Sequence, residues 1–273
     1  MNKIAVLSTN ENPDYFFYAP IVEWAWNKFG WDIALFVTDE CPEIPMRGEN
    51  TIIHQIPYIE GVRSGTLAQC VRHFVSNVLP FEDYIMVQDI DLIPLKPWEP
   101  DLTAQTIWGW ELTGHSFIPV HYTGMIGDKW YSLMGCTGDL KADMEREMKE
   151  NGRAYKEKWD DYWDADWDIL TKKVLAKKSD FTFIERGLIN LGKYSTPKGR
   201  VDRCSIEVSP IDNSYSWGYT LNQNNLIDMH CENNNPSSPE KWKMIREVLV
   251  NTFKEIPDWM DSYVETHHKQ YGK

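Results

Sequence analysis

The sequence is short of the features that hold small disulfide-rich or zinc-bound proteins together. Its five cysteines are odd in number, lie far apart and include no C-x-x-C motif. Neither a disulfide framework nor a zinc knuckle is therefore indicated. A reducing compartment suits such a chain, and we expect a cytoplasmic protein. The cysteines are Cys41, Cys70, Cys136, Cys204 and Cys231.

Long hydrophobic runs are also missing. The apolar run that begins at Ile4 is too short for the core of a signal peptide. No stretch approaches the roughly 20 apolar residues that cross a bilayer. The sequence therefore predicts no membrane span.

Positive charge is scarce. The chain has 28 Lys and Arg against 41 Asp and Glu, a formal net charge of −13 at pH 7. Such a charge repels phosphate backbones and anionic lipid surfaces unless basic residues are concentrated locally. The lysines between Lys172 and Lys178 form one such cluster, which is typical of a solvated helix face. A metal cation is thus a more natural partner than a nucleic acid.

Aromatic residues, in contrast, are abundant. Thirteen Trp and thirteen Tyr occur among 273 residues, of which 42% are hydrophobic and 25% charged. This balance is that of an ordinary globular protein, and the length fits one large α/β domain. Aromatic faces stack on sugars and bases as well as filling cores, and we expect most of these residues in the core.

Strand and helix patterns alternate in residues 1–98. Apolar runs of strand length end in polar loops, and the segments between them carry apolar residues at helical spacing. The order strand, helix, strand, strand, helix, strand is characteristic of nucleotide-binding folds. The expected strands are Ile4–Ser8, Trp31–Thr38, Thr51–Pro57 and Tyr84–Val87, and the expected helices are Ala19–Phe29 and Thr66–Val78, the latter with Gln69, Arg72 and His73 on its polar face.

Residues 99–273 are less regular but contain no linker that would separate a second domain, so we expect a single domain over residues 1–273. The segment from Lys193 to Asn235 is rich in Ser, Asn, Gly and Asp and predicts loops and short strands. Around it the patterns predict strands at Thr106–Glu111 and Phe181–Glu185 and helices at Lys141–Glu150, Asp168–Lys177 and Pro239–Lys254.

Two aspartates follow the strand at Tyr84–Val87. Asp89 and Asp91 are two apart, so in extended backbone both carboxylates point to one side. Carboxylates are hard oxygen ligands that hold Mg²⁺ or Mn²⁺ together with phosphate oxygens. The spacing alone also fits a turn in which the aspartates accept backbone N–H bonds. The surrounding residues favour the metal site.

Those residues are Arg72 and the run FEDYIMVQDIDLIPL over residues 81–95. They resemble glycosyltransferases of the GT-A fold, in particular the glycogenin and lipopolysaccharide galactosyltransferase group, and the match is good over residues 63–98. The resemblance implies a Rossmann-like mixed central sheet flanked by helices. It also implies that Arg72 contacts a nucleotide-sugar, while Asp89 and Asp91 bind the ribose and a metal, Mn²⁺ or Mg²⁺.

On the same resemblance, residues 1–98 form the nucleotide-sugar-binding half, and residues 99–273 form the acceptor side with the C-terminal helices. Ser8, Thr9 and Asn10 are similar to the family's first nucleotide-contacting loop. We therefore expect backbone and hydroxyl contacts to the nucleotide there.

His230 follows an apolar run, where a neutral imidazole can complete a metal site, although a lone histidine is more often structural. The resemblance implies that His230 is the third metal ligand. The family then has a Gly-x-x-Lys-Pro-Trp stretch that closes on the phosphates, and that pattern is absent here. Lys241, Arg200 and Arg203 are left as candidates to neutralise the leaving diphosphate.

Asp166-Trp167-Asp168 opens an expected helix, where carboxylates cap free N–H groups. The resemblance implies instead that Asp166 and Asp168 line the donor or acceptor site. An inverting transfer needs a carboxylate base near the acceptor hydroxyl, and Asp168, Asp166 or Glu111 would serve. A retaining transfer, which the resemblance favours, needs no such base. Glu111 and the loop around His121 follow the metal motif, within reach of an acceptor.

Other functions fit parts of the sequence. A phosphatase of the haloacid dehalogenase type would use Asp89 as a nucleophile. A non-catalytic carbohydrate-binding protein would use the aromatic residues. A sugar nucleotidyltransferase would need a Gly-rich loop after the first strand, and Ser8 to Asn12 contain no glycine.

The sequence thus favours a metal-dependent hexosyl- or pentosyltransferase with a UDP- or GDP-sugar as donor. A glycan, a small molecule, a protein and a modified DNA base all remain open as acceptors.

Overall fold

A computed structural model describes residues 1–110, 117–151, 165–191, 194–197, 199–203, 206–209, 211–212, 214–217 and 226–272. Glu111 and Cys204, both named above, lie outside these residues. Across the described ranges, no helix combines the length and the apolar character needed to cross a bilayer.

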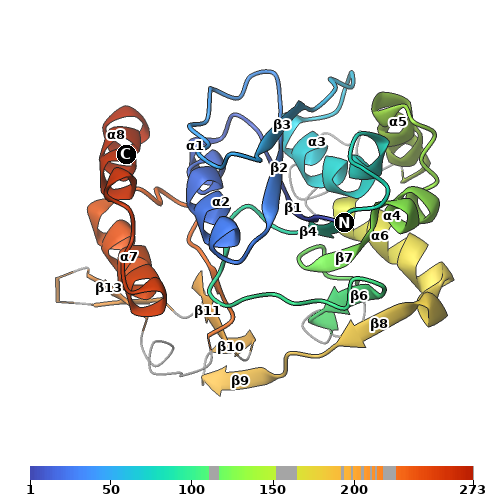
Figure 1. The fold of residues 1–273 in the computed structure, drawn as a ribbon. Helices are drawn as coiled ribbons and strands as arrows, with labels where there is room; N and C mark the ends of the chain where they lie inside the picture. The colour runs from blue at the N-terminus through green and yellow to red at the C-terminus, as the bar shows by residue number, and fades with distance from the viewer. Residues whose placement is uncertain are drawn as a thin grey trace.

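A seven-stranded sheet forms the centre of the fold, in the order β3-β2-β1-β4-β7-β6-β8 (Figure 1). The first four strands pair in parallel, β7 runs antiparallel to β4 and β6, and β6 and β8 are parallel. This mixed sheet confirms the predicted fold class. In sheet order the strands are Ile52–Gln55, Asp32–Val37, Lys3–Thr9, Tyr84–Val87, Thr123–Ile126, Gln105–Trp108 and Phe181–Ile184.

Helices cover both faces of this sheet and enclose two cores. Alternate side chains of a strand point to opposite faces, so Ala5 and Leu7 of β1 pack in one core and Ile4 and Val6 in the other. The first core lies against α2, α7 and α8, and the second against α3 to α6. The helices are α1 (Pro13–Phe16), α2 (Ala19–Lys28), α3 (Ser64–Val71), α4 (Gly127–Met134), α5 (Leu140–Asn151), α6 (Ala165–Ala176), α7 (Pro239–Phe253) and α8 (Asp258–Tyr271).

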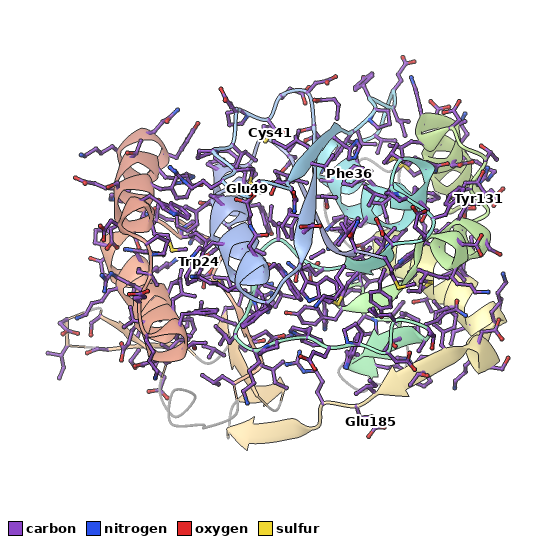
Figure 2. The ribbon with its side chains drawn as sticks, in the orientation of Figure 1. Trp24, Phe36, Cys41, Glu49, Tyr131 and Glu185 are labelled. Atoms are coloured by element: carbon purple, nitrogen blue, oxygen red, sulfur yellow. The ribbon has the colours of Figure 1, made fainter. Side chains whose placement is uncertain are left out.

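Aromatic side chains fill much of both cores. Trp24 of α2 packs against Phe253 of α7 with ring centroids 4.7 Å apart, and Phe36 of β2 is buried on the other face of the sheet (Figure 2). Trp26 and Trp31 are fully buried in contact with each other. The abundance of aromatic residues is therefore explained largely by packing.

A three-stranded sheet, in the order β11-β14-β5, brings a distant segment to the end of β4. β5 (Leu92–Pro94) follows Asp91 directly, and β14 (Asp228–His230) pairs with it so that His230 faces Leu92. The pairing therefore places His230 beside Asp91. The remaining short strands are β9 (Leu188–Leu191), β10 (Tyr194–Pro197), β11 (Arg200–Asp202), β12 (Glu207–Val208) and β13 (Tyr215–Ser216).

One predicted helix has a different form and environment. The helix expected over Thr66–Val78 is α-helical only to Val71 and continues as a 3₁₀ helix, η1 (Arg72–Asn77). Arg72 and His73, expected on its polar face, are buried. Helices α4, α5 and α6, from later in the chain, pack against α3 and η1 and cover this face.

The sequence patterns do not predict β7, α4 or α8, and they begin α6 too late. The buried residues of α8 are Met260, Val264 and His267, and their spacing of four and three is helical, so the sequence does carry a signal for this helix. Helix α6 begins at Ala165, so Asp166 lies in its first turn and not before it.

His267 attaches α8 to the start of α1. Its buried ring has Nε2 3.1 Å from the backbone oxygen of Pro13 and Nδ1 3.0 Å from Oγ of Ser237. A carbonyl oxygen only accepts, so Nε2 carries the proton and Nδ1 accepts from the Ser237 hydroxyl. Burial lowers the pKa of His267 to about 4, although Pro13 and Asp14 act in the opposite direction.

We expect acid to destabilise the fold through His267. Between its unfolded pKa of 6.5 and its folded pKa of about 4, the unfolded chain binds a proton that the folded chain does not. The free energy of unfolding should fall over this range by up to about 3 kcal/mol, with no contribution above it. Urea denaturation at about pH 4.5 and about pH 7.5 measures the difference. His267→Gln can keep both hydrogen bonds without titrating; an equally steep fall in that variant would contradict the assignment.

Candidate functional site

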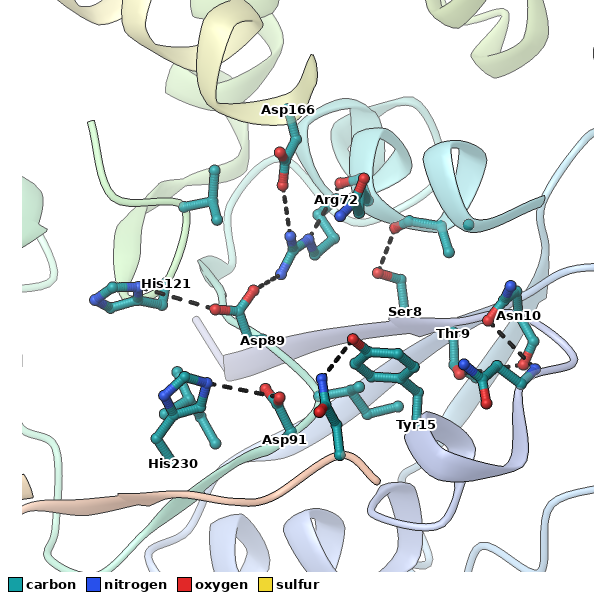
Figure 3. A pocket seen from close by; sticks show the side chains of 18 of the residues that line it. Ser8, Thr9, Asn10, Tyr15, Arg72, Asp89, Asp91, His121, Asp166 and His230 are labelled. Atoms are coloured by element: carbon teal, nitrogen blue, oxygen red, sulfur yellow. Dashed lines mark hydrogen bonds and ion pairs between the residues drawn. The ribbon is translucent and has the colours of Figure 1, made fainter. Parts of the chain in front are cut away.

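A cavity of about 930 Å³ opens where β1 and β4 end (Figure 3). In open α/β sheets, ligands bind at the carboxyl ends of the strands. The cavity brings together most of the side chains that the sequence marks as functional. These are Ser8, Thr9, Asn10, Arg72, Asp89, Asp91, Asp166 and His230.

Arg72 is the centre of the hydrogen bonding in this cavity. Its side chain, at the start of η1, is only 5% exposed. Nη1 donates to Oδ1 of Asp89 at 2.5 Å and to the backbone oxygen of Gln88 at 2.8 Å, and Nη2 donates to Oδ2 of Asp166 at 2.7 Å. A guanidinium stays charged and donates in several directions within one plane. Arg72 therefore ties the end of β4 to the first turn of α6.

The two carboxylates on Arg72 differ in their environment. The side chain of Asp166 is 2% exposed and that of Asp89 is 30% exposed. Burial raises the pKa of Asp166 to about 6 in spite of Arg72. Burial acts in the same direction on Asp89, but Arg72 and His121 outweigh it and lower the pKa to about 2. Asp166 is thus the first of the two to take a proton as the pH falls.

Asp91 faces a different set of partners. Its Oδ2 lies 3.6 Å from Nε2 of His230 and accepts from Nη1 of Arg203 at 3.1 Å. The spacing of the two aspartates predicts that both lie on one side of extended backbone. The chain instead turns between the two aspartates, so that Asp89 faces Arg72 and Asp91 faces His230 (Figure 3).

Asp91 and His230 fit a divalent cation as a pair of ligands. Oδ2 of Asp202 lies 3.4 Å from Nδ1 of His230 and orients the ring with Nε2 toward Asp91. Within the described ranges, no three His, Cys, Asp or Glu side chains are grouped so that they could hold an ion. Ions such as Mg²⁺ are often bound through one or two carboxylates, with phosphate oxygens and water completing the shell. Two protein ligands are therefore enough for an ion that arrives with a diphosphate.

The protonation of His230 is coupled to such binding. Burial lowers its pKa, but Asp91 and Asp202 outweigh this effect and raise the pKa to about 9. A metal ligand must be neutral imidazole, so binding of an ion there would release a proton.

The loop after β1 lines another part of the cavity. Oγ of Ser8 donates to the backbone oxygen of Ala68 at 2.5 Å and fastens the loop to α3. Nδ2 of Asn10 donates to Oγ of Ser64 at 3.2 Å, and Thr9 donates to the backbone of Asn10. These bonds fix the loop; its contact with a nucleotide stays a prediction.

The cavity also contains residues that the sequence analysis does not assign to the site. Nδ2 of Asn233 donates to the Tyr15 hydroxyl at 2.7 Å, across 218 residues of sequence, so no local spacing could reveal the pair. Nδ1 of His121 lies 3.9 Å from Oδ2 of Asp89. It precedes Tyr122, whose backbone is left-handed, with φ at 56°. The sequence marks His121 only as part of a loop within reach of an acceptor.

The three carboxylates considered as a base differ in position. Asp166 lines the cavity but is bound to Arg72. Asp168 is partly buried in the first turn of α6 and is not among the residues that line the cavity. Glu111 lies outside the described residues.

Three solved structures that are similar to this chain are those of glycosyltransferases. A galactosyltransferase, LgtC, in complex with donor and acceptor sugar analogues has 10% sequence identity and a TM-score of 0.48; the match covers 95% of this chain and 99% of LgtC. GlyE from Streptococcus pneumoniae has 14% identity and a TM-score of 0.43, over 67% of this chain and 46% of GlyE. The bifunctional WbbM has 11% identity and a TM-score of 0.43, over 97% of this chain and 51% of WbbM.

Neither a protein-family model nor a curated protein sequence matches the chain. Because the TM-scores of these solved structures lie below 0.5, the case for a function rests on the site itself.

We expect removal of Arg72 to destabilise the fold because it leaves Asp166 buried without its cation. Arg72→Ala should lower the free energy of unfolding by about 3–5 kcal/mol at neutral pH. Adding Asp166→Asn removes the buried charge and should recover part of this loss, with a coupling of at least about 1 kcal/mol. Urea denaturation of the native chain, both single variants and the double variant gives the coupling. Strictly additive losses would contradict a direct buried ion pair.

Proposed function

We propose that this chain is a glycosyltransferase that moves a hexosyl or pentosyl group from a UDP- or GDP-sugar to an acceptor hydroxyl, with Mn²⁺ or Mg²⁺ as cofactor. One observation carries the proposal: a single cavity combines the loop after β1, the cluster around Arg72 and the pair of Asp91 and His230. A nucleotide-sugar consists of a nucleoside, a diphosphate and a sugar. The loop offers polar groups to the nucleoside, Asp89 of the Arg72 cluster can accept from a hydroxyl of the donor, and Asp91 and His230 can hold a cation for the diphosphate.

The donor would extend across the cavity from the loop after β1. Thr9 and Asn10 offer backbone and side-chain groups to the base and ribose. Asp89 is held by Arg72 with its other oxygen, Oδ2, pointing away from that bond, where it can accept from a hydroxyl of the donor. Arg72 thus acts on Asp89 as a positioning residue, since it fixes both the charge and the direction of the carboxylate.

Asp91 and His230 would hold the cation, and Asp202 would keep the His230 ring in place. When bound, the cation supplies positive charge that stabilises the departing nucleoside diphosphate. The cavity walls exclude part of the bulk water, which strengthens every charge interaction within them.

The acceptor would enter from the side of α6 and the segment around His121. For an inverting transfer, the base would come from Asp166, Asp168 or Glu111. The bond from Arg72 to Asp166 favours a binding role for Asp166, because that carboxylate is already bound by a guanidinium and is only 2% exposed. A retaining transfer, as in the family that the sequence resembles, would need none of the three as a base.

We expect Asp91→Asn to abolish the effect of the cation on donor binding. A panel of UDP- and GDP-sugars is screened by thermal shift with and without Mn²⁺. One donor with Mn²⁺ should stabilise the native chain, by about 2.7 kcal/mol at a hundredfold excess over its dissociation constant. The same donor and Mn²⁺ should leave Asp91→Asn almost unchanged.

Asp128→Asn is the matched control, because Asp128 is an exposed aspartate in the first turn of α4, away from the cavity. It should respond like the native chain. Stabilisation that ignores both Mn²⁺ and Asp91→Asn would contradict the metal site. No stabilisation by any donor would contradict the proposed class of enzyme.

A further inference from the structure

A departing nucleoside diphosphate needs positive charge from the protein as well as from a metal, and Lys241 is one candidate to supply it. Lys241 is buried on α7, outside the residues that line the cavity. Its Nζ donates to the backbone oxygen of Asn234 and lies 5.7 Å from the centroid of the Tyr215 ring. Lys241 therefore serves the packing of α7.

Arg200 lines the cavity but is committed to another partner. Its Nε and Nη2 donate to the two oxygens of Asp228, both at 2.9 Å. Arg186 binds the same carboxylate at 2.8 and 3.2 Å, and none of the three side chains is more than 4% exposed. A move of Arg200 toward a ligand would weaken the neutralisation of a buried carboxylate, which is costly. Arg200 is thus part of the cavity wall.

Arg203 differs from both. It follows β11, lines the cavity and has a side chain that is 27% exposed. Among the residues that the structure describes, its ion pair is a single contact, from Nη1 to Oδ2 of Asp91 at 3.1 Å. The same carboxylate oxygen is the one that faces His230. A charged, partly exposed guanidinium therefore lies beside the position at which a cation and its diphosphate would bind.

We propose that Arg203 stays paired with the carboxylate of Asp91 until the cation and the donor arrive, and that it then binds the diphosphate of the donor. This inference rests on the proposed function. Arg203 is paired with a carboxylate that is only 6% exposed. Once Oδ2 of Asp91 is bound to a cation, it is a poorer acceptor for Arg203. The guanidinium then turns to the phosphate oxygens on that cation, which it can bind in a bidentate manner.

Two effects of opposite sign follow from this double role. Removal of the Arg203 side chain takes a positive charge and a competitor away from Asp91, so the cation alone should bind more tightly. The same removal takes a charged donor away from the phosphates, so a nucleoside diphosphate should bind more weakly. If Arg203 had only a structural role, its removal would weaken both the binding of the cation and the binding of the nucleoside diphosphate.

The test compares the native chain with Arg203→Ala by calorimetry, using Mn²⁺ alone and then UDP and GDP at saturating Mn²⁺. We expect Arg203→Ala to bind Mn²⁺ at least about threefold more tightly. It should bind the preferred nucleoside diphosphate about 10- to 100-fold more weakly. The affinity for the matching nucleoside, uridine or guanosine, measured by NMR titration, should change by less than about twofold, since it carries no phosphate.

Two variants control for charge and for folding. Arg203→Lys keeps the charge without the planar fork, so it should keep the native Mn²⁺ affinity and lose only part of the diphosphate affinity. Arg63→Ala removes a cation from the same cavity, at the start of α3. It should change the Mn²⁺ affinity by less than about twofold, because the ion pairs of Asp91 among the described residues come from Arg203 and His230.

The outcomes separate this inference from the proposed function. If the native chain binds UDP or GDP and Arg203→Ala binds it equally well, the role of Arg203 is wrong and the proposed function stands. If Mn²⁺ binds Arg203→Ala no more tightly than the native chain, Arg203 does not compete for Asp91 and the inference is likewise wrong. If the native chain binds neither nucleotide, the proposed function and the inference both fall.

Discussion

A guanidinium stays charged even with almost no contact with water, so its burial is costly unless anions surround it, and this constraint organises the cavity. Arg72 is held by the carboxylates of Asp89 and Asp166 and by the backbone oxygen of Gln88. These acceptors belong to the end of β4 and the first turn of α6. The charge can be buried only when η1, β4 and α6 stand in one arrangement, and the direction of Asp89 follows from that arrangement.

A second constraint acts on the other aspartate through sheet pairing. β14 returns from late in the chain and pairs with β5, so that backbone hydrogen bonds set the distance between Asp91 and His230. The Cys231 N–H donates to the backbone oxygen of Asp91 at 2.9 Å and extends this pairing to Asp91 itself. Asp89 and Asp91, only two positions apart in sequence, are thus positioned by two independent parts of the fold.

Features that depend on neighbouring residues could be predicted from the sequence, and features that depend on contacts between distant segments could not. The strands at Ile4–Ser8 and Tyr84–Val87 and the helix at Pro239–Lys254 were correctly located because apolar periodicity is a local property. Asp89 and Asp91 were recognisable because their spacing and the residues around them are also local features. The burial of Arg72 depends on α6, almost a hundred residues away, so an amphipathic pattern assigned it wrongly to a polar face.

The pair formed by Tyr15 and Asn233 exists only in the folded chain. The position of His121 depends on a left-handed Tyr122, whose ring stacks on Trp98 with centroids 4.2 Å apart. Such a conformation is uncommon for an aromatic residue and has no signal in a single sequence. The same stack shows aromatic residues supporting the site from within the core.

The metal site is tested most directly by anomalous diffraction at the manganese edge from crystals grown with Mn²⁺ and UDP or GDP. We expect one peak in the cavity, roughly 2–2.5 Å from Oδ2 of Asp91 and Nε2 of His230, with the diphosphate on the same ion. A nucleotide bound in the cavity with manganese elsewhere, or with both side chains unligated, would contradict this metal site.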